Sequence, residues 1–249
     1  MVGISVIIPF YNSALSIEKV VERIGLVLSK LRFEVIIVDD GSDHLLVGDV
    51  LDRVQAKFDY VSVHHQKNMG VSAARNKGVI LSKYELVAFC DSDDIWTKDK
   101  LKYQYSHLIR GDFQFIGAEK RLGTRRELVK INKFWEIVSW GPHVSSVIMQ
   151  KSLFLKVGGF NEEFKRLEDG EFMLRLIEEI GRIDCINRNL HKNWKNKRAY
   201  GVEGLSSNLI KMYQGELLAV RKSGGIIGNV LIPFLLLKFL KRALIQKLT

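Results

Sequence analysis

Three carboxylates stand within four residues, directly after a short apolar run. Asp91, Asp93 and Asp94 follow residues 86–90, whose composition favours a buried parallel strand. Acids this close together repel one another, so a positive group is expected between them. Carboxylate oxygens suit Mg²⁺ or Mn²⁺, and such a cation carrying a diphosphate is the simplest occupant. The alternative is a solvated acidic turn that caps the next helix, and the cluster alone favours neither.

Three other loops begin where an apolar run ends and could line the same crevice. They are residues 9–12 (PFYN), 39–42 (DDGS) and 68–78 (NMGVSAARNKG). In an open α/β sheet, the loops at the carboxyl ends of the strands form the ligand crevice. Tyr11 could stack on a base, Asp39 could accept hydrogen bonds from a base or ribose, and Arg75 could contact phosphate. Taken singly, each is more often a turn residue or an ion-pair partner.

The elements that must position these loops alternate between strands and helices. Strands are expected at residues 4–8, 33–38, 60–64 and 86–90. Helices are expected at 14–31 with Ser13 as N-cap, from a cap at Asp43 to about Phe58, and at 72–81. This alternation predicts an α/β fold with a parallel sheet and right-handed crossovers. A chain of 249 residues with 47% hydrophobic content can bury a sizeable core.

Cysteine usage and charge narrow the class of protein. Cys90 and Cys185 lie in apolar runs without a C-x-x-C partner, which predicts reduced core residues in a cytosolic protein, with no zinc site. No secretory signal is expected at the N-terminus. The net charge of +10 suits a protein that binds nucleic acid, anionic lipid or phosphorylated small molecules. It also suits a basic surface kept for solubility.

Residues 226–240 (IIGNVLIPFLLLKFL) form a nearly apolar segment followed by lysines and an arginine. The segment is short for a membrane-spanning helix and is interrupted by Asn229 and Pro233. It favours an interfacial helix whose basic residues reach anionic headgroups. A core-packing or dimer helix is the alternative.

Considered together, these motifs resemble glycosyltransferase family 2. The resemblance rests on residues 6–12 (VIIPFYN), 35–42 (VIIVDDGS), 68–78 and 89–94 (FCDSDD), and covers about residues 3–210. It implies the GT-A fold, a Rossmann-like and mostly parallel sheet flanked by helices. The implied domain spans 1–215, with a nucleotide-binding half (1–95) and an acceptor-binding half (96–215). Residues 216–249 would form a C-terminal helical, membrane-associating segment.

The resemblance implies roles for the matching side chains. Asp39 would hydrogen-bond the base, usually uracil, and Asp91 would face the ribose. Asp93 would bind Mn²⁺ or Mg²⁺ on the diphosphate, while Asp94 would support the site from behind or begin the next helix. The implied nucleotide-sugar site comprises Pro9, Phe10, Tyr11, Asp39, Arg75, Asp91 and Ser92.

The second half supplies the expected base and acceptor site. Residues 158–162 (GGFNE) and 168–172 (EDGEF) are similar to family motifs, although Asn161 replaces the usual aspartate. The family acid aligned with Asp169 takes the proton from the acceptor hydroxyl. Physical reasoning alone also allows Glu168 and Asp169 to be acids that a helix N-terminus favours.

Further candidates lie in two segments of this half. Trp140 and His143 could shape an acceptor pocket together with Glu168, although a loop histidine with ordinary partners is the commoner case. The basic run 191–198 around Trp194 resembles a segment that closes over the diphosphate in related enzymes. A membrane-facing basic patch is the alternative.

The implied reaction is an inverting, metal-dependent transfer from a UDP-hexose or UDP-N-acetylhexosamine to a saccharide hydroxyl. The expected acceptor is lipid-diphosphate-linked, in O-antigen or capsule synthesis on the cytoplasmic face of the inner membrane, with no nucleic-acid partner. A sugar nucleotidyltransferase should carry a glycine-rich basic loop after the first strand, which residues 9–12 do not provide. A non-catalytic basic membrane- or nucleic-acid-binding protein leaves the acidic crevice unexplained. A dehydrogenase would need a G-x-G-x-x-G motif.

Overall fold

The computed structural model describes residues 3–110, 113–119, 126–133, 136–137, 141–164 and 168–194. The predicted domain boundary at residue 215, the helical segment 216–249 and Trp140 lie outside the described residues. In the described part of the chain, no helix is both long enough and apolar enough to cross a membrane.

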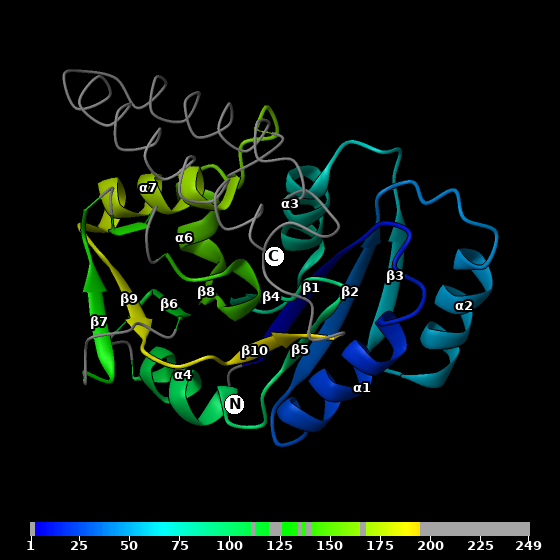
Figure 1. Cartoon of the computed structure of the whole chain (residues 1–249), viewed down its shortest axis with the longest axis horizontal. Coiled ribbons are helices and arrows are strands. Elements are labelled where there is room, and N and C mark those ends of the chain that lie inside the picture. The colour runs from blue at the N-terminus through cyan, green and yellow to red at the C-terminus, as the bar shows by residue number, and fades with distance from the viewer. Residues whose placement is uncertain are drawn as a thin grey trace, which may run out of the picture.

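A mixed sheet runs through the centre of the molecule, in the order β3-β2-β1-β4-β8-β6-β9-β7 (Figure 1). Its strands are β1 (Ile4–Phe10), β2 (Phe33–Asp39), β3 (Val61–His65), β4 (Leu86–Phe89), β6 (Phe115–Ala118), β7 (Leu128–Ile131), β8 (Ile148–Gln150) and β9 (Ile183–Ile186). Strands β3, β2, β1 and β4 are parallel, as the alternating pattern predicted. Strand β8 is antiparallel to β4 and β6, and β7 is antiparallel to β9, so the second half of the sheet is mixed.

Helices cover both faces of this sheet (Figure 1). One face carries α1 (Ile17–Leu28), α2 (Val47–Lys57) and α4 (Lys100–Ile109); the other carries α3 (Val71–Leu81), α6 (Lys151–Lys156) and α7 (Glu168–Ile180). Successive side chains of β1 alternate between the two cores. Val6 and Ile8 pack in the core beside α1 and α2, whereas Ile7 packs in the core beside α6 and α7. The α/β fold predicted from the sequence is confirmed.

Two predicted helix caps are wrong, because neither Ser13 nor Asp43 stands at the start of its helix. Helix α1 begins at Ile17 with Ser16, not Ser13, at the N-cap, and the Ser16 hydroxyl donates to the Ser92 carbonyl over 2.7 Å. Helix α2 begins at Val47, and the Asp43 carboxylate accepts a 2.7 Å hydrogen bond from Asn12. Both contacts fasten the loops of the predicted crevice to each other or to the first helix.

A small two-stranded sheet forms beside the main one. Strand β5 (Asp94–Trp96) pairs antiparallel with β10 (His191–Asn193), about 100 residues later in the chain. The expectation that Asp94 begins the next helix is therefore wrong, since α4 begins at Lys100. This pairing brings the start of the basic run against the acidic loop.

Lys100 is fully buried next to this small sheet. Its ammonium donates to the Gln104 side chain over 2.8 Å and to the Ser146 carbonyl over 2.7 Å, and lies 4.7 Å from the centroid of the Trp96 ring. Burial lowers the pKa of Lys100 from its usual value of 10.5 to about 7. Cys90 is also buried, and burial raises the pKa of its thiol.

The buried lysine predicts that stability rises with pH above neutrality. Between pH 7 and 10.5 the unfolded chain holds a proton on Lys100 that the folded protein lacks. Stability should therefore increase by up to about 1.4 kcal/mol per pH unit in this interval. Urea unfolding at pH 7.5 and 9.0 should show the wild type gaining about 1–2 kcal/mol relative to Lys100→Met. An equal response of both proteins would contradict this account.

Candidate active site

The loops after β1, β2 and β4 converge at one edge of the sheet. The Asp40 amide donates to the Phe10 carbonyl over 2.8 Å, and the Asn12 amide donates to the Ser42 hydroxyl over 2.9 Å. Arg75 on α3 connects the third expected loop to Asp91. The convergence predicted from the strand ends is therefore present in the fold.

Asp39 and Asp40 differ in what they bind. Asp39 is nearly buried; one of its oxygens accepts from the amide and hydroxyl of Ser42, and the other lies 3.0 Å from His65 Nδ1. The Asp40 carboxylate accepts from the backbone amides of Met69 and Gly70, each over 2.8 Å. Asp40 thereby shapes the glycine loop at the start of α3, while Asp39 lies at the crevice edge with His65.

The three residues predicted to surround the base differ from one another in how far their side chains are exposed. Tyr11 is 47% exposed beyond the end of β1. Phe10 is only 1% exposed and its ring packs in the core with α1. Pro9 is buried within β1. Of the three, Tyr11 alone presents its side chain at the surface.

A buried ion-pair triad lies beneath the crevice. The Arg75 guanidinium donates to Asp91 over 2.8 Å and to Glu168 over 2.9 Å, and its side chain is 4% exposed. Burial alone would raise the pKa of Asp91, but Arg75 lowers it. For Glu168 the effect of burial is the larger, so its pKa is raised despite Arg75. Arg75 thus joins the acidic loop to the first turn of α7.

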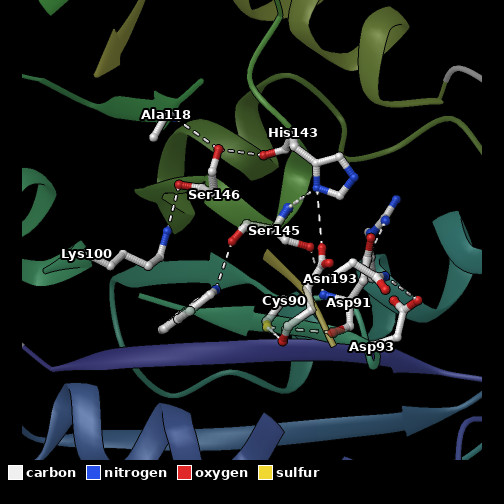
Figure 2. A network of polar contacts seen from close by, with 12 residues as sticks. Cys90, Asp91, Asp93, Lys100, Ala118, His143, Ser145, Ser146 and Asn193 are labelled. Carbon is white, nitrogen blue, oxygen red and sulfur yellow. Dashed lines mark hydrogen bonds and ion pairs between the residues drawn. The ribbon is translucent and has the colours of Figure 1, made fainter. Parts of the chain in front are cut away.

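Asp93 points outward and contacts the strand that leads to the basic run. Asn193 donates to the Asp93 carboxylate over 2.9 Å, and the Trp194 amide donates to the Asp93 carbonyl over 2.7 Å (Figure 2). Lys19 of α1 lies 4.3 Å from the centroid of the Trp194 ring. The exposed carboxylate is therefore held at the crevice rim by Asn193 and the Trp194 backbone.

Asp94 is buried behind this rim, with two histidines beside it. His143 Nδ1 lies 3.6 Å from an Asp94 oxygen, and the His143 ring stacks on His191 with centroids 4.6 Å apart. Burial, followed by the Asp91 charge, raises the pKa of Asp94 to about 6. Burial lowers the pKa of His191 to about 3. Burial also opposes the charged form of His143, but the carboxylates of Asp91 and Asp94 outweigh it and raise its pKa.

The short helix η1 (Val144–Ser146) contacts the acidic loop through Ser145 (Figure 2). The Ser145 hydroxyl accepts from the Asp91 amide over 3.0 Å, and the Ser145 carbonyl accepts from the Trp96 ring over 2.8 Å. The Ser146 hydroxyl accepts from the Ala118 amide over 3.0 Å. Ser145 thus fixes the first residue of the acidic loop, in which Asp91 meets Arg75, Asp93 meets Asn193 and Asp94 faces the histidines.

The glycine motif of the second half docks directly on α3. Asn76 donates to the Phe160 carbonyl and accepts from the Phe160 amide, each over 2.8 Å. A side chain at Gly159, whose φ is 67°, would lie only 2.7 Å from the Asn76 oxygen. Asp169 follows in the first turn of α7, partly exposed, and accepts from the Gly170 amide over 2.7 Å. It is close enough to His143 for its charge to raise the pKa of that ring.

The amino-acid pattern of this chain decides its family. A model of glycosyl transferase family 2 matches residues 5–158, more than half of the chain. The chain belongs to glycosyl transferase family 2. The match includes every loop of the crevice that comes from the first half.

Among the proteins similar to this family 2 chain are one relative in sequence and two proteins of known structure. Succinoglycan biosynthesis protein ExoW of Rhizobium meliloti is 30% identical over 114 residues, which covers 45% of this chain and 36% of the relative. TarS 1-349 of S. aureus, solved in complex with UDP-GlcNAc, has a TM-score of 0.60 at 19% identity and covers 96% of this chain and 72% of that one. Mannosyltransferase PcManGT of Pyrobaculum calidifontis, solved with GDP-Man and Mn²⁺, has a TM-score of 0.68 at 18% identity. The match covers 93% of this chain and 67% of PcManGT.

These comparisons establish the family and the GT-A fold. The identities of the two solved structures are low, so they bear on the fold alone. The chain spans less than two thirds of the length of several curated relatives, 18% of one and 62% of another.

The family resemblance predicted most residues of the crevice, but not the residues from distant segments that contact its three acids. Of the predicted residues, Asp91, Arg75 and Glu168 meet in one triad, Ser92 is tied to α1 through its carbonyl, and Trp194 contacts Asp93 through its amide. The neighbours of the three acids, which are Asn193, Ser145 and His191, are not evident from the sequence. No local pattern reveals them, because each depends on the pairing of β5 with β10 or on the position of η1.

Removing Arg75 should destabilise the fold strongly. Arg75→Met would leave the nearly buried Glu168 carboxylate and the partly exposed Asp91 carboxylate without their cation. Breaking a buried pair in this way costs about 3–5 kcal/mol. Arg53→Met is the matched control, because Arg53 is 60% exposed and lies 3.9 Å from Glu18, where an ion pair contributes about 0–1 kcal/mol. Urea unfolding of both variants tests this, and equal losses would contradict the role of the triad.

Proposed function

We propose that this family 2 protein is an inverting glycosyltransferase that moves a sugar from a nucleotide donor to a hydroxyl of a saccharide acceptor. One observation carries the proposal: an exposed carboxylate, Asp93, stands at the crevice rim beside an Asp91 that is paired with Arg75. The exposed, negatively charged Asp93 could bind a divalent cation, and that cation could bind the diphosphate of a nucleotide-sugar donor. The complexes of TarS with UDP-GlcNAc and of PcManGT with GDP-Man support a nucleotide-sugar donor.

The base of the donor is assigned to the loops after β1 and β2. Tyr11 offers an exposed ring for stacking, and Asp39 offers a carboxylate oxygen at the crevice edge. His65 lies 3.0 Å from that oxygen, so a base bonded to Asp39 would also meet the imidazole. A uracil base fits this edge, because its N3–H can donate to the carboxylate. We therefore assign a UDP-hexose or UDP-N-acetylhexosamine as donor.

A divalent cation, Mn²⁺ or Mg²⁺, is assigned to Asp93. The available ligand atoms fit such an ion. An exposed carboxylate is a hard oxygen ligand, and the diphosphate would supply further oxygens. When bound, the cation would offset the negative charge that develops on the departing nucleoside diphosphate. Asn193 and the Trp194 amide would keep Asp93 in place. The Mn²⁺ in the PcManGT complex is consistent with this assignment.

Asp169 is assigned as the general base. It would accept the proton of the acceptor hydroxyl while that oxygen bonds to the anomeric carbon and the bond to the donor diphosphate breaks. Its position in the first turn of α7 places it near Glu168, which Arg75 joins to Asp91. A single displacement of this kind inverts the anomeric configuration.

The acceptor is proposed to be a lipid-diphosphate-linked saccharide used in a bacterial surface polysaccharide, such as O-antigen or capsule. The apolar and basic residues 216–249 support placement on the cytoplasmic face of the inner membrane. The relative ExoW, named for succinoglycan biosynthesis, supports a polysaccharide product.

A panel of nucleotide sugars with Mn²⁺ and a lipid-diphosphate-linked saccharide tests the function. One or a few UDP-sugars should yield UDP and an extended saccharide, and EDTA should stop the reaction. Formation of a nucleotide sugar from a sugar phosphate and a nucleoside triphosphate would instead indicate a nucleotidyltransferase. Salt-sensitive oligonucleotide binding without transfer would contradict the proposal.

A further inference from the structure

Helices α3 and α7 lie on the same face of the sheet, and both carry side chains of the candidate site (Figure 1). Helix α3 carries Arg75, which contacts the acidic loop through Asp91. Helix α7 carries Glu168 and Asp169 in its first turn. The ion pair between Arg75 and Glu168, over 2.9 Å, is one connection between the two helices. One contact does not fix the orientation of two helices, so a second point of attachment is needed.

The residue after Arg75 supplies this second attachment through the glycine turn (residues 158–160). The Asn76 side chain donates to the Phe160 carbonyl and accepts from the Phe160 amide, each over 2.8 Å. Its nitrogen also donates to the Glu162 carboxylate over 2.9 Å. An asparagine side chain carries both a donor and an acceptor, so it holds the two backbone groups of Phe160 at once.

The glycine turn also packs closely against Asn76. Gly158 and Gly159 have φ values of 81° and 67°, in the left-handed region that favours glycine. A Cβ atom at Gly159 would lie 2.7 Å from the Asn76 oxygen and 3.1 Å from the Phe154 ring. The turn is therefore held against α3 by close packing as well as by hydrogen bonds.

Helix α7 binds the same turn from its own side. The Arg175 guanidinium donates to the Gly159 carbonyl over 2.7 Å and also to the Val157 carbonyl. The Phe160 and Phe172 rings lie with their centroids 4.4 Å apart. The glycine turn is thus bonded to α3 through Asn76 and to α7 through Arg175, and it separates the two helices by a defined distance.

We propose that Asn76 is a positioning residue that sets the separation of α3 and α7 through the glycine turn, and so places Asp169 relative to the donor crevice. This role rests on the proposed function in one respect, the assignment of Asp169 as the base. The partners of Asn76, Phe160 and Glu162, do not belong to the donor crevice. A shift of the base by about 1 Å can lower turnover about 100-fold, because the reacting atoms must be aligned. Loss of Asn76 should therefore lower turnover and leave donor binding unchanged.

Asn76→Ala and Asn76→Asp, each in the full chain, test this separation of effects. Aspartate keeps the acceptor for the Phe160 amide but loses the donor, and its charge faces Glu162. We expect the kcat of sugar transfer to fall about 10–100-fold in both variants, with the Kd of UDP within about twofold of the wild type. Calorimetry measures the Kd. If Asn76→Ala does not fold, Asn76→Asp decides, because it preserves the volume of the side chain.

A distance measurement tests the same separation without any substrate. Spin labels on Ile80→Cys of α3 and Glu178→Cys of α7 would occupy exposed positions, and the native Cys90 and Cys185 are buried. Pulsed electron paramagnetic resonance then reports the distance between the two helices. Asn76→Ala should shift or broaden this distance distribution relative to the same labelled chain with Asn76.

The matched control is Ser5→Ala. Ser5 is buried, donates to Glu34 over 2.6 Å and accepts from the Tyr84 amide, at the end of β1 that lies away from the crevice. This variant should lose stability yet keep the turnover and the label distance. Unchanged turnover, an unchanged label distance or a loss of UDP binding in the Asn76 variants would each overturn the inference. Absence of transfer by the wild type would overturn the proposed function instead, and the label distance would still decide whether Asn76 sets the helix separation.

Discussion

Asp93→Ala should lower metal-dependent sugar transfer by at least about a thousandfold while leaving the fold intact. Asp93 is exposed, so its removal leaves no buried charge unpaired. What the variant loses is the carboxylate assigned to the cation on the donor diphosphate. Steady-state transfer with saturating Mn²⁺ measures the effect, and thermal unfolding verifies the fold.

Asp99→Ala is the matched control for this loss. Asp99 is also exposed, lies a few residues further along and makes no side-chain capping bond at the start of α4. It should keep nearly full activity. If Asp93→Ala also retained full activity, the cation would have to be held elsewhere or the transfer would not need one.

The second large effect is expected at Asp169. Asp169→Asn should bind the donor as the wild type does, yet lose about 10²–10⁴-fold in turnover, because an amide cannot take the proton from the acceptor hydroxyl. Asparagine keeps the oxygen that accepts from the Gly170 amide, so the first turn of α7 should persist. Donor affinity by calorimetry and turnover by product formation separate binding from chemistry.

Two neighbours on α7 sharpen this test. Glu178→Gln changes an exposed carboxylate on the same helix and should leave turnover unchanged. Glu168→Gln removes a charge from the Arg75 triad and should act mainly on stability. Loss of turnover in Glu168→Gln with full turnover in Asp169→Asn would transfer the role of base to Glu168.

The parallel half of the fold was predictable because its pattern is local. Val6, Ile7 and Ile8 form a continuous apolar run because β1 is buried on both faces. Helix α1 repeats its buried residues at helical spacing, which also predicted it. The caps at Ser13 and Asp43 were wrong because Ser16 holds the N-cap position of α1 and Asp43 binds Asn12, and the local sequence shows neither.

The site was predictable in its residues but not in its connections. The spacing of Asp91, Asp93 and Asp94 indicated an acidic cluster, yet the structure resolves it into three carboxylates with separate surroundings. That division depends on Arg75, Asn193 and His143, which lie 16, 100 and about 50 residues from their acids. Such contacts follow from sheet topology, which single-sequence patterns do not specify.

The stereochemistry of the transferred sugar tests the central claim most directly. A single base at Asp169 opposite the departing diphosphate requires one displacement at the anomeric carbon. NMR of the product formed from an α-linked UDP-sugar should therefore show a β-linkage. A product that keeps the α-configuration would contradict the proposed mechanism.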